Sequence, residues 1–328
     1  MAVGLRINYG DRVMDISANT RVMSFVSRWS TTGSNPTASF PIRAGASLVV
    51  MPVNTVSELW NWNSTTITYY SYINNISIAG NVVTLSINTP NKNAAQKTQF
   101  VLDIYQVDGI APPGVVGMFM RDSSDVMSIT DAGQVAQCVM RSKIQVNNTY
   151  ALGIPADSAV FCRWNDSSGR LFLDRNTMTL YAYGSGDYTA GVIDVQVVAF
   201  RNQAPLPHNG GLNIYKGDGS GQLIFSTEKP PFLFNDAYYQ LPRGQFDSFV
   251  GPSAALGSPM VCMSSVGVGT GSATQNGGYK AIFDVGFRMS GGSIAAHICK
   301  PTGGRNYGAL DPTISLARIP AIDADKYF

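Results

Sequence analysis

Apolar and polar residues alternate along most of the chain, in short runs broken by Gly, Asn, Asp and Ser. The opening run "GLRINYGDRVMDIS", from Gly4 to Ser17, predicts two short strands joined by a polar turn. "NNISIAGNVVTLSIN", from Asn74, predicts a hairpin around a Gly-Asn turn, and "GRLFLDRNTMTLYAYG", from Gly169, predicts another. The best helical candidate, which starts at Ile129, fits a strand nearly as well. Short strands separated by turns indicate β-sandwiches or small barrels.

The opening pattern returns twice. "GMFMRDSSDVMSIT" begins at Gly117 and "GLNIYKGDGSGQLIFST" begins at Gly211. Each copy starts with Gly, alternates apolar residues, turns on small polar residues and alternates again. Self-similarity of this kind is the first guide to architecture.

Two further markers repeat in the same order. A central strand appears as "SLVVMPVN", "SAVFCRWN" and "SPMVCMSS", and an apolar strand with one acid follows it each time. The acids recur about every 90 residues, at Asp103, Asp194 and Asp284. Three markers in one order predict a module present three times.

The repeat, with Pro-rich joints at "GIAPPG" and "NQAPLPHNGG", places the domain boundaries. We predict an all-β protein of three tandem β-sandwich-like domains related by internal repeat. They cover residues 1–110, 111–204 and 205–328, and the third carries a C-terminal extension.

One position of the central strand holds Met51, Cys162 and Cys262 in its three copies. Because free Cys behaves as a small hydrophobe, this exchange indicates a core position rather than a disulfide. We expect all four cysteines, which include Cys138 and Cys299, to be reduced core residues.

The composition of the chain limits the kinds of partner that it is expected to bind. Charged residues make up 13% of the 328 and the net charge is +2, with no basic block. Phosphate contacts dominate nucleic-acid affinity, so nucleic acid is not an expected partner. We expect no membrane insertion, because no apolar run approaches the roughly 18 residues that span a bilayer. The N-terminus lacks a signal-peptide pattern, which predicts synthesis in a cytoplasm.

Few residues of the sequence are candidates for catalysis or for binding a cofactor or metal. His208 and His297 are the only histidines, neither is repeated, and no nucleophile-elbow sequence accompanies them. An acid present in every copy is better explained by bonds to backbone amides of its own domain, or by pairing with a local cation, than by catalysis. The Gly-rich stretch from Val266 lacks the ending of a phosphate loop, and the turn at Asp218 lacks the further acids of a calcium loop. We therefore expect no enzyme activity, cofactor or metal site.

One stretch stands out for recognition. "ELWNWNSTTITYYSYINN", from Glu58 to Asn75, concentrates aromatic residues among Asn, Ser and Thr. Such residues give large contact area at low entropy cost, so the stretch is a candidate interface or glycan surface. The alternative is a hairpin whose aromatics alternate between core and solvent. The candidate residues are Trp60, Trp62, Tyr69, Tyr70 and Tyr72.

The repeated hairpins carry a resemblance to a family. "GLNIYKGDGSGQLIFSTEKPPF", and more loosely "VGLRINYGDRVMDIS", resemble a pattern in tail-tip and minor tail proteins of long-tailed bacteriophages. In that pattern a chain begins with Gly-Leu and a short strand, turns, and gives an apolar strand that ends in Asp or Ser. The copy at Gly117 matches less well, the third copy has an insertion at its turn, and the first lacks "KPPF".

The resemblance implies a virion protein of the distal tail, assembled in the host cytoplasm. It implies roles in tip assembly and host attachment, other tail proteins as partners, and a homo-oligomer with a trimer favoured. A host surface receptor or glycan would be the external ligand. The alternative from the residues themselves is a carbohydrate-binding adhesin that uses the aromatic stretch between Trp60 and Tyr72.

Overall fold

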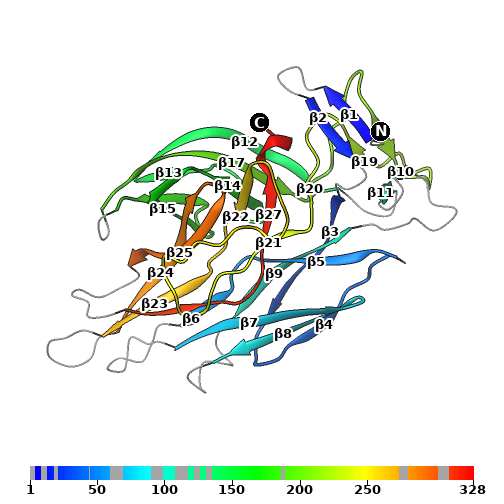
Figure 1. The fold of residues 1–328 in the computed structure, drawn as a ribbon. Coiled ribbons are helices and arrows are strands. Elements are labelled where there is room, and N and C mark those ends of the chain that lie inside the picture. The colour runs from blue at the N-terminus through cyan, green and yellow to red at the C-terminus, as the bar shows by residue number, and fades with distance from the viewer. Residues whose placement is uncertain are drawn as a thin grey trace.

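The computed structural model of the chain describes residues 4–8, 13–17, 21–43, 45–59, 69–89, 99–107, 117–121, 126–130, 135–185, 189–272, 280–301 and 310–328. These residues form 27 strands and one short 3₁₀ helix, and all the pairings between strands are antiparallel (Figure 1). The prediction of an all-β protein is confirmed. Within the described residues, the helical candidate that starts at Ile129 contributes to two strands.

We call the three successive groups of strands units 1, 2 and 3. Unit 1 contains β1 (Gly4–Asn8), β2 (Val13–Ser17), β3 (Arg21–Thr31), β4 (Thr37–Ser39), β5 (Ser47–Pro52), β6 (Val56–Leu59), β7 (Tyr69–Ala79), β8 (Val82–Asn88) and β9 (Phe100–Val107). Unit 2 contains β10 (Gly117–Arg121), β11 (Val126–Thr130), β12 (Gln137–Asn147), β13 (Thr149–Ala151), β14 (Ala159–Arg163), β15 (Asp166–Asp174), β16 (Thr179–Tyr183) and β17 (Val192–Arg201).

Unit 3 is the longest and ends at the C-terminus. It contains β18 (Asn213–Tyr215), β19 (Leu223–Ser226), β20 (Leu233–Phe234), β21 (Ala237–Tyr239), β22 (Pro259–Cys262), β23 (Gly267–Ser272), β24 (Lys280–Ser290), β25 (Ser293–Pro301), β26 (Leu310–Ile314), β27 (Ile319–Asp323) and the helix η1 (Ala324–Lys326).

Each unit opens with a separate two-stranded hairpin, as the repeated opening pattern predicted. The hairpins are β1–β2, β10–β11 and β18–β19. Figure 1 shows the labelled strands of these hairpins gathered at one end of the molecule, close to the N-terminus. Buried side chains anchor two of them, because Ile7 and Met14 of β1–β2 and Phe225 of β18–β19 belong to the largest apolar core.

The strands that follow each hairpin repeat one arrangement of two layers. In one layer the last strand lies between two earlier ones, in the orders β3-β9-β5, β12-β17-β14 and β21-β27-β22. The other layer contains a hairpin, formed by β7–β8, β15–β16 and β24–β25. The hairpins predicted from Asn74 and Gly169 are therefore present, and Gly80 turns the first with φ of 60°. Apolar faces of the two layers meet, as in a sandwich.

The third repeated acid does not lie where the sequence placed it. Asp103 and Asp194 belong to the middle strands β9 and β17, but Asp284 belongs to β24, a hairpin strand. The middle position of unit 3 is filled by β27, which pairs with both β21 and β22. The last residues of the chain, expected as an extension, therefore form an internal strand. Both β24 and β27 are apolar strands that contain one acidic residue. The sequence pattern alone therefore does not show which of them takes the middle position of the layer.

Units 2 and 3 share both of their layers. β14 pairs with β22 through Phe161 and Cys262, and β15 pairs with β24 through Leu171 and Phe287. The backbones approach closely at the second contact, since a Cβ on Gly286 would clash with the carbonyl oxygen of Leu171. The result is a sheet of 13 strands, which turns from one layer to the other at β12 and β13.

The space between the two layers of unit 1 holds an apolar cluster of its own. A larger cluster contains residues of all three units, so the units share part of their core. It includes Met51, Cys162 and Cys262, the three residues of the repeated central-strand position. Its hub is Phe232, whose ring lies 4.3 Å from Phe200 and 5.5 Å from Tyr105, centroid to centroid. The first Pro-rich joint lies outside the described residues. The second is followed closely by residues of this common core.

The four cysteines are free and buried, which confirms the prediction of reduced core residues. Burial raises the pKa of both the Cys262 thiol and the Cys299 thiol to about 12. A thiol with such a pKa is almost entirely protonated at neutral pH, and the thiolate is the nucleophilic form. These side chains act as packing residues.

Candidate functional site

The aromatic stretch is only partly described. Trp60 and Trp62 lie outside the described residues, and for Tyr69 and Tyr70 the structure gives the backbone, which pairs with β6. The Tyr72 side chain is 8% exposed and packs against Val56 and against Val268 of unit 3; its hydroxyl accepts a hydrogen bond from Asn88. Tyr72 therefore joins two units inside the molecule.

The repeated acids of units 1 and 2 bind partners on the neighbouring strand. Asp103, buried in β9, accepts two hydrogen bonds from the Arg28 guanidinium, at 2.7 and 2.9 Å. At the same cross-strand position in unit 2, Asp194 accepts a hydrogen bond of 3.1 Å from Gln145. The prediction that each acid binds a local cation or a backbone amide is confirmed for Asp103, whereas Asp194 binds a neutral side-chain amide. In unit 1 the pair is charge-assisted, which strengthens it and raises the pKa of Arg28.

His208 holds the joint between units 2 and 3 to the hairpin that follows it. Its Nδ1 lies 2.8 Å from the Thr227 hydroxyl, and its Nε2 lies 3.8 Å from a carboxylate oxygen of Glu228. The backbone N–H of His208 also donates to Asn213 in β18. These contacts give His208 a structural role, because they attach the β18–β19 hairpin to the joint.

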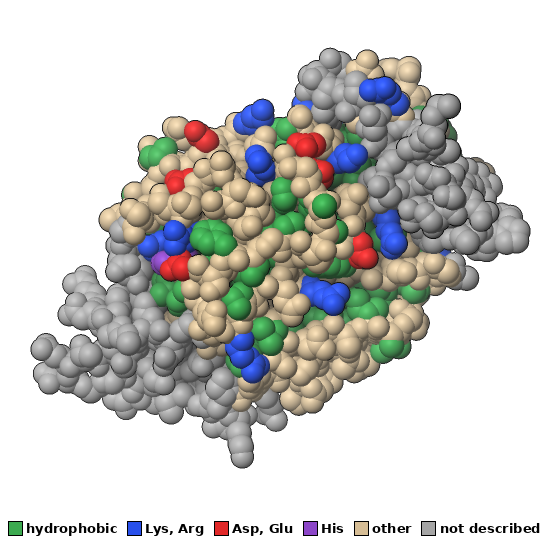
Figure 2. Space-filling model, viewed as in Figure 1, with side chains coloured by type: hydrophobic (Ala, Val, Ile, Leu, Met, Phe, Trp, Pro, Cys, Tyr) green, Lys and Arg blue, Asp and Glu red, His purple; other side chains and the backbone are tan. Residues whose placement is uncertain are grey.

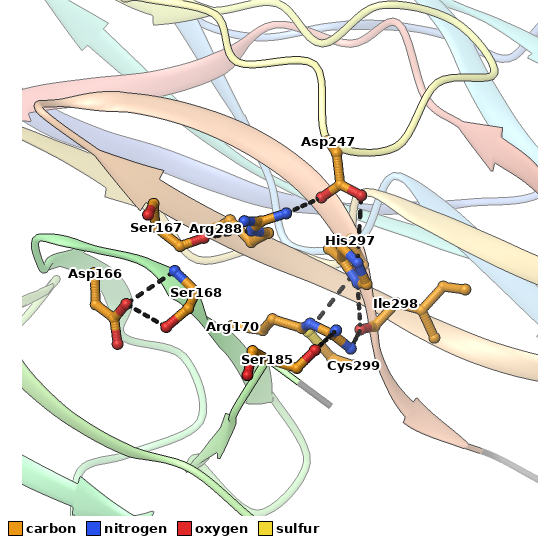
Figure 3. A network of polar contacts seen from close by, with 10 residues as sticks. All are labelled: Asp166, Ser167, Ser168, Arg170, Ser185, Asp247, Arg288, His297, Ile298 and Cys299. Atoms are coloured by element: carbon orange, nitrogen blue, oxygen red, sulfur yellow. Dashed lines mark hydrogen bonds and ion pairs between the residues drawn. The ribbon is translucent and has the colours of Figure 1, made fainter. Parts of the chain in front are cut away.

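His297 belongs to a polar network at the contact of units 2 and 3 (Figure 3). Its Nδ1 donates a hydrogen bond of 3.0 Å to the carbonyl oxygen of Ile298, because that oxygen can only accept. Its Nε2 lies 3.4 Å from Asp247, and Asp247 also binds Arg288. Arg288 donates in turn to the carbonyl oxygen of Ser167 in unit 2, at 2.6 Å.

A second arginine extends the network. Arg170 of β15, itself buried, donates to the carbonyl oxygens of Ser185 and Ile298 at 3.1 and 3.4 Å. The Cys299 sulfur contacts the backbone carbonyl oxygen of His297. The two ring nitrogens of His297 face Ile298 and Asp247. The network joins β15 of unit 2 to β24 and β25 of unit 3 and to the segment that carries Asp247.

Backbone conformation and a backbone hydrogen bond fix the position of the chain segment that carries Asp247. Asp247 has φ of 62°, a left-handed conformation that Asp tolerates better than most residues. Its amide donates to the carbonyl oxygen of Ala296, at 3.1 Å, so the segment runs along β25. Neighbouring Phe246 stacks on the His297 ring, with centroids 6.1 Å apart. These contacts are non-local, and no spacing in the sequence indicates them.

Burial lowers the pKa of His297 below its usual value, and the nearby guanidinium groups of Arg170 and Arg288 lower it further. The hydrogen bond to Ile298 and the carboxylate of Asp247 raise the pKa, but they do not offset this decrease. The unfolded chain therefore binds a proton more readily than the folded one. We expect the free energy of unfolding to fall as the pH drops between about pH 7 and pH 5. Urea unfolding across this range, on the wild type and His297→Gln, measures the effect. The variant should show a smaller slope; equal slopes would contradict the prediction.

An open cleft of about 380 Å³ lies on unit 2 and is lined in part by Asp166, the residue before Ser167. The Asp166 carboxylate accepts hydrogen bonds from the backbone N–H and the hydroxyl of Ser168, at 2.8 and 2.7 Å. These bonds lower the pKa of Asp166. The lining is rich in carboxylates and amides, groups that bind hydroxyls. It comprises Arg163, Trp164, Asn165, Asp166, Val192, Ile193, Asp194 and Gln196.

On the described part of the face drawn in Figure 2, charged side chains lie singly or in small groups of both signs, among mostly uncharged surface. Within the described ranges, no group of three His, Cys, Asp or Glu side chains is placed to hold a metal ion. No helix among the described elements is long and apolar enough to cross a membrane.

A protein family described as "Family of unknown function (DUF6453)" matches residues 4–306, so the chain belongs to that family. No curated protein matches the chain, and no solved structure does.

Proposed function

We propose that this member of a family of unknown function is a non-enzymatic structural protein of a bacteriophage tail tip or tail fibre. It would contribute to tip assembly and to host-cell attachment, as a virion protein assembled in the host cytoplasm. The observation that carries the proposal is the threefold hairpin. Units 1 and 3 open with the pattern that resembles tail proteins and unit 2 opens with a less similar copy, and the three hairpins gather at one end of the molecule (Figure 1).

The contacts of the described side chains support a structural role for the protein. The repeated acids Asp103 and Asp194 bind neighbouring strands, and the network of His297 joins two units. An assembly component of this kind would contact other tail proteins through its hairpin end. It would form a homo-oligomer, with a trimer favoured, and face a host receptor or glycan elsewhere.

Immunolabelling of intact virions tests this proposal. An antibody to the full chain, viewed by negative-stain electron microscopy, should decorate the distal tail. Label confined to the capsid, or absent from virions whose lysate contains the protein, would contradict it.

A carbohydrate-binding adhesin is the second candidate, and the polar cleft on unit 2 favours it. A glycan array probed with the full chain tests this function. Loss of binding in Trp60→Ala and Trp62→Ala would assign it to the aromatic stretch, and loss in Asp194→Ala would assign it to the cleft. Absence of binding to any glycan would contradict this candidate.

A further inference from the structure

The hairpin strands of units 2 and 3 pair with each other at equivalent positions. Leu171 and Phe287, which face each other, each lie three residues before the residue that closes its hairpin, Asp174 or Ser290. In unit 1 the closing residue is Ala79, so the equivalent position is Ile76 in β7. Two of the three equivalent strand edges are therefore used for pairing inside the molecule.

The corresponding edge of β7 is open. Up to Ile73 the edge is occupied: its N–H donates to Thr55 at 2.9 Å, and its carbonyl oxygen accepts from Ser315 at 2.6 Å. Beyond that point β7 pairs with β8 alone. Ile76 faces Leu85, whose N–H points away from β7 and donates to Pro36.

This arrangement marks Ile76 and Leu85 as a pair that exchanges no backbone hydrogen bonds, so the peptide groups of Ile76 also point away from β8. By the same alternation, those of Ile78 do too. No backbone bond to either residue on this side is formed within the described part of the chain.

A groove of about 340 Å³ lies against this edge, between units 1 and 3. Its unit 1 wall is mainly aliphatic, and Ile78 is 43% exposed there, whereas the equivalent Met289 of unit 3 is fully buried. The whole lining comprises Val50, Asn75, Ile76, Ile78, Tyr238, Gln240, Leu316 and Arg318.

The unit 3 wall carries a positive charge. The Arg318 guanidinium lies 5.8 Å from the centroid of the Tyr238 ring, a cation–π contact that holds it at the groove. Arg318 takes part in none of the salt bridges among the described residues. The groove thus combines unpaired backbone groups, an aliphatic wall and a cation.

We propose that the open edge of β7 binds a short extended segment of a partner protein that carries an acidic side chain. Strand addition satisfies the free peptide groups of Ile76 and Ile78, as β15 and β24 do for each other. An apolar side chain of the segment packs against Ile78 and Leu316, and its carboxylate binds Arg318. The groove is at the small end of ligand sites, which limits the segment to a few residues.

This inference goes beyond a role in tail assembly and does not depend on it. The full chain is titrated with an acetylated and amidated peptide, Thr-Val-Asp-Val-Thr, by isothermal titration calorimetry. The matched control peptide has Lys in place of Asp. We expect the Asp peptide to bind, the Lys peptide to bind at least about tenfold more weakly, and Arg318→Ala to lose about fivefold in affinity for the Asp peptide. Arg201→Ala, whose arginine pairs with Asp157 elsewhere, should bind as the wild type does.

Amide hydrogen exchange distinguishes strand addition from binding by charge alone. The amides of Ile76 and Ile78 should exchange more slowly when the Asp peptide is present. Equal binding of the two peptides, unchanged exchange at these amides, or no binding at about 1 mM peptide would overturn the proposal. A dimer by light scattering with these amides already protected would also overturn it, because the edge would then belong to a second copy.

Discussion

Replacing Phe232 by Ala should lower the free energy of unfolding by about 4 kcal/mol, because truncation of a fully buried ring leaves a cavity. Phe232 is 0% exposed and contacts Tyr105 of unit 1 and both Phe161 and Phe200 of unit 2. Its backbone also bridges units, since its carbonyl oxygen accepts from Met23 and its N–H donates to Ala136. Urea unfolding followed by circular dichroism measures the loss.

The matched control is Leu206→Ala, which removes an apolar side chain that is 55% exposed. It should change the free energy of unfolding by less than about 0.5 kcal/mol. If Phe232→Ala unfolded only one part of the chain, or cost no more than Leu206→Ala, the common core would be disproved.

Replacing Arg28 by Ala should cost about 3 kcal/mol. The substitution leaves the Asp103 carboxylate, whose side chain is 3% exposed, without the guanidinium that binds it at two points. Breaking a buried pair costs about 3–5 kcal/mol, and the lower end applies because the Arg28 side chain is 33% exposed. Chemical denaturation at neutral pH gives the value.

Unit 2 supplies the control for this variant. Gln145 occupies the position of Arg28 and binds Asp194, but this pair is exposed and the glutamine is uncharged. Gln145→Ala should therefore cost less than about 0.5 kcal/mol. Similar losses in the two variants would show that burial and charge do not set the strength of the contact.

The hairpins were predictable because their partners are close in sequence. Alternation around Gly80 fixes which residues of β7 and β8 face the same side, and the three opening patterns carry the same local information. The all-β class follows from many such segments. The middle strand of unit 3 was not predictable, because β27 lies far along the chain from β21 and contacts strands that any apolar segment could pair with.

The site was less predictable than the fold. The local pairing of Asp103 with a cation followed from the repetition of the acids, but Arg28 and Gln145, the partners of Asp103 and Asp194, carry no repeated signal. The network of His297 depends on Asp247, which is 50 positions earlier and has an unusual backbone conformation. The open edge of β7 becomes visible only when the equivalent strands of the other units are seen paired.

Differential scanning calorimetry of the full chain tests most directly whether the three units form one structure around a shared core. For a single cooperative unit, the calorimetric enthalpy equals the van't Hoff enthalpy. We predict one transition with a ratio near one. Separate transitions, or a ratio near three, would show that the units unfold independently and would contradict the shared core.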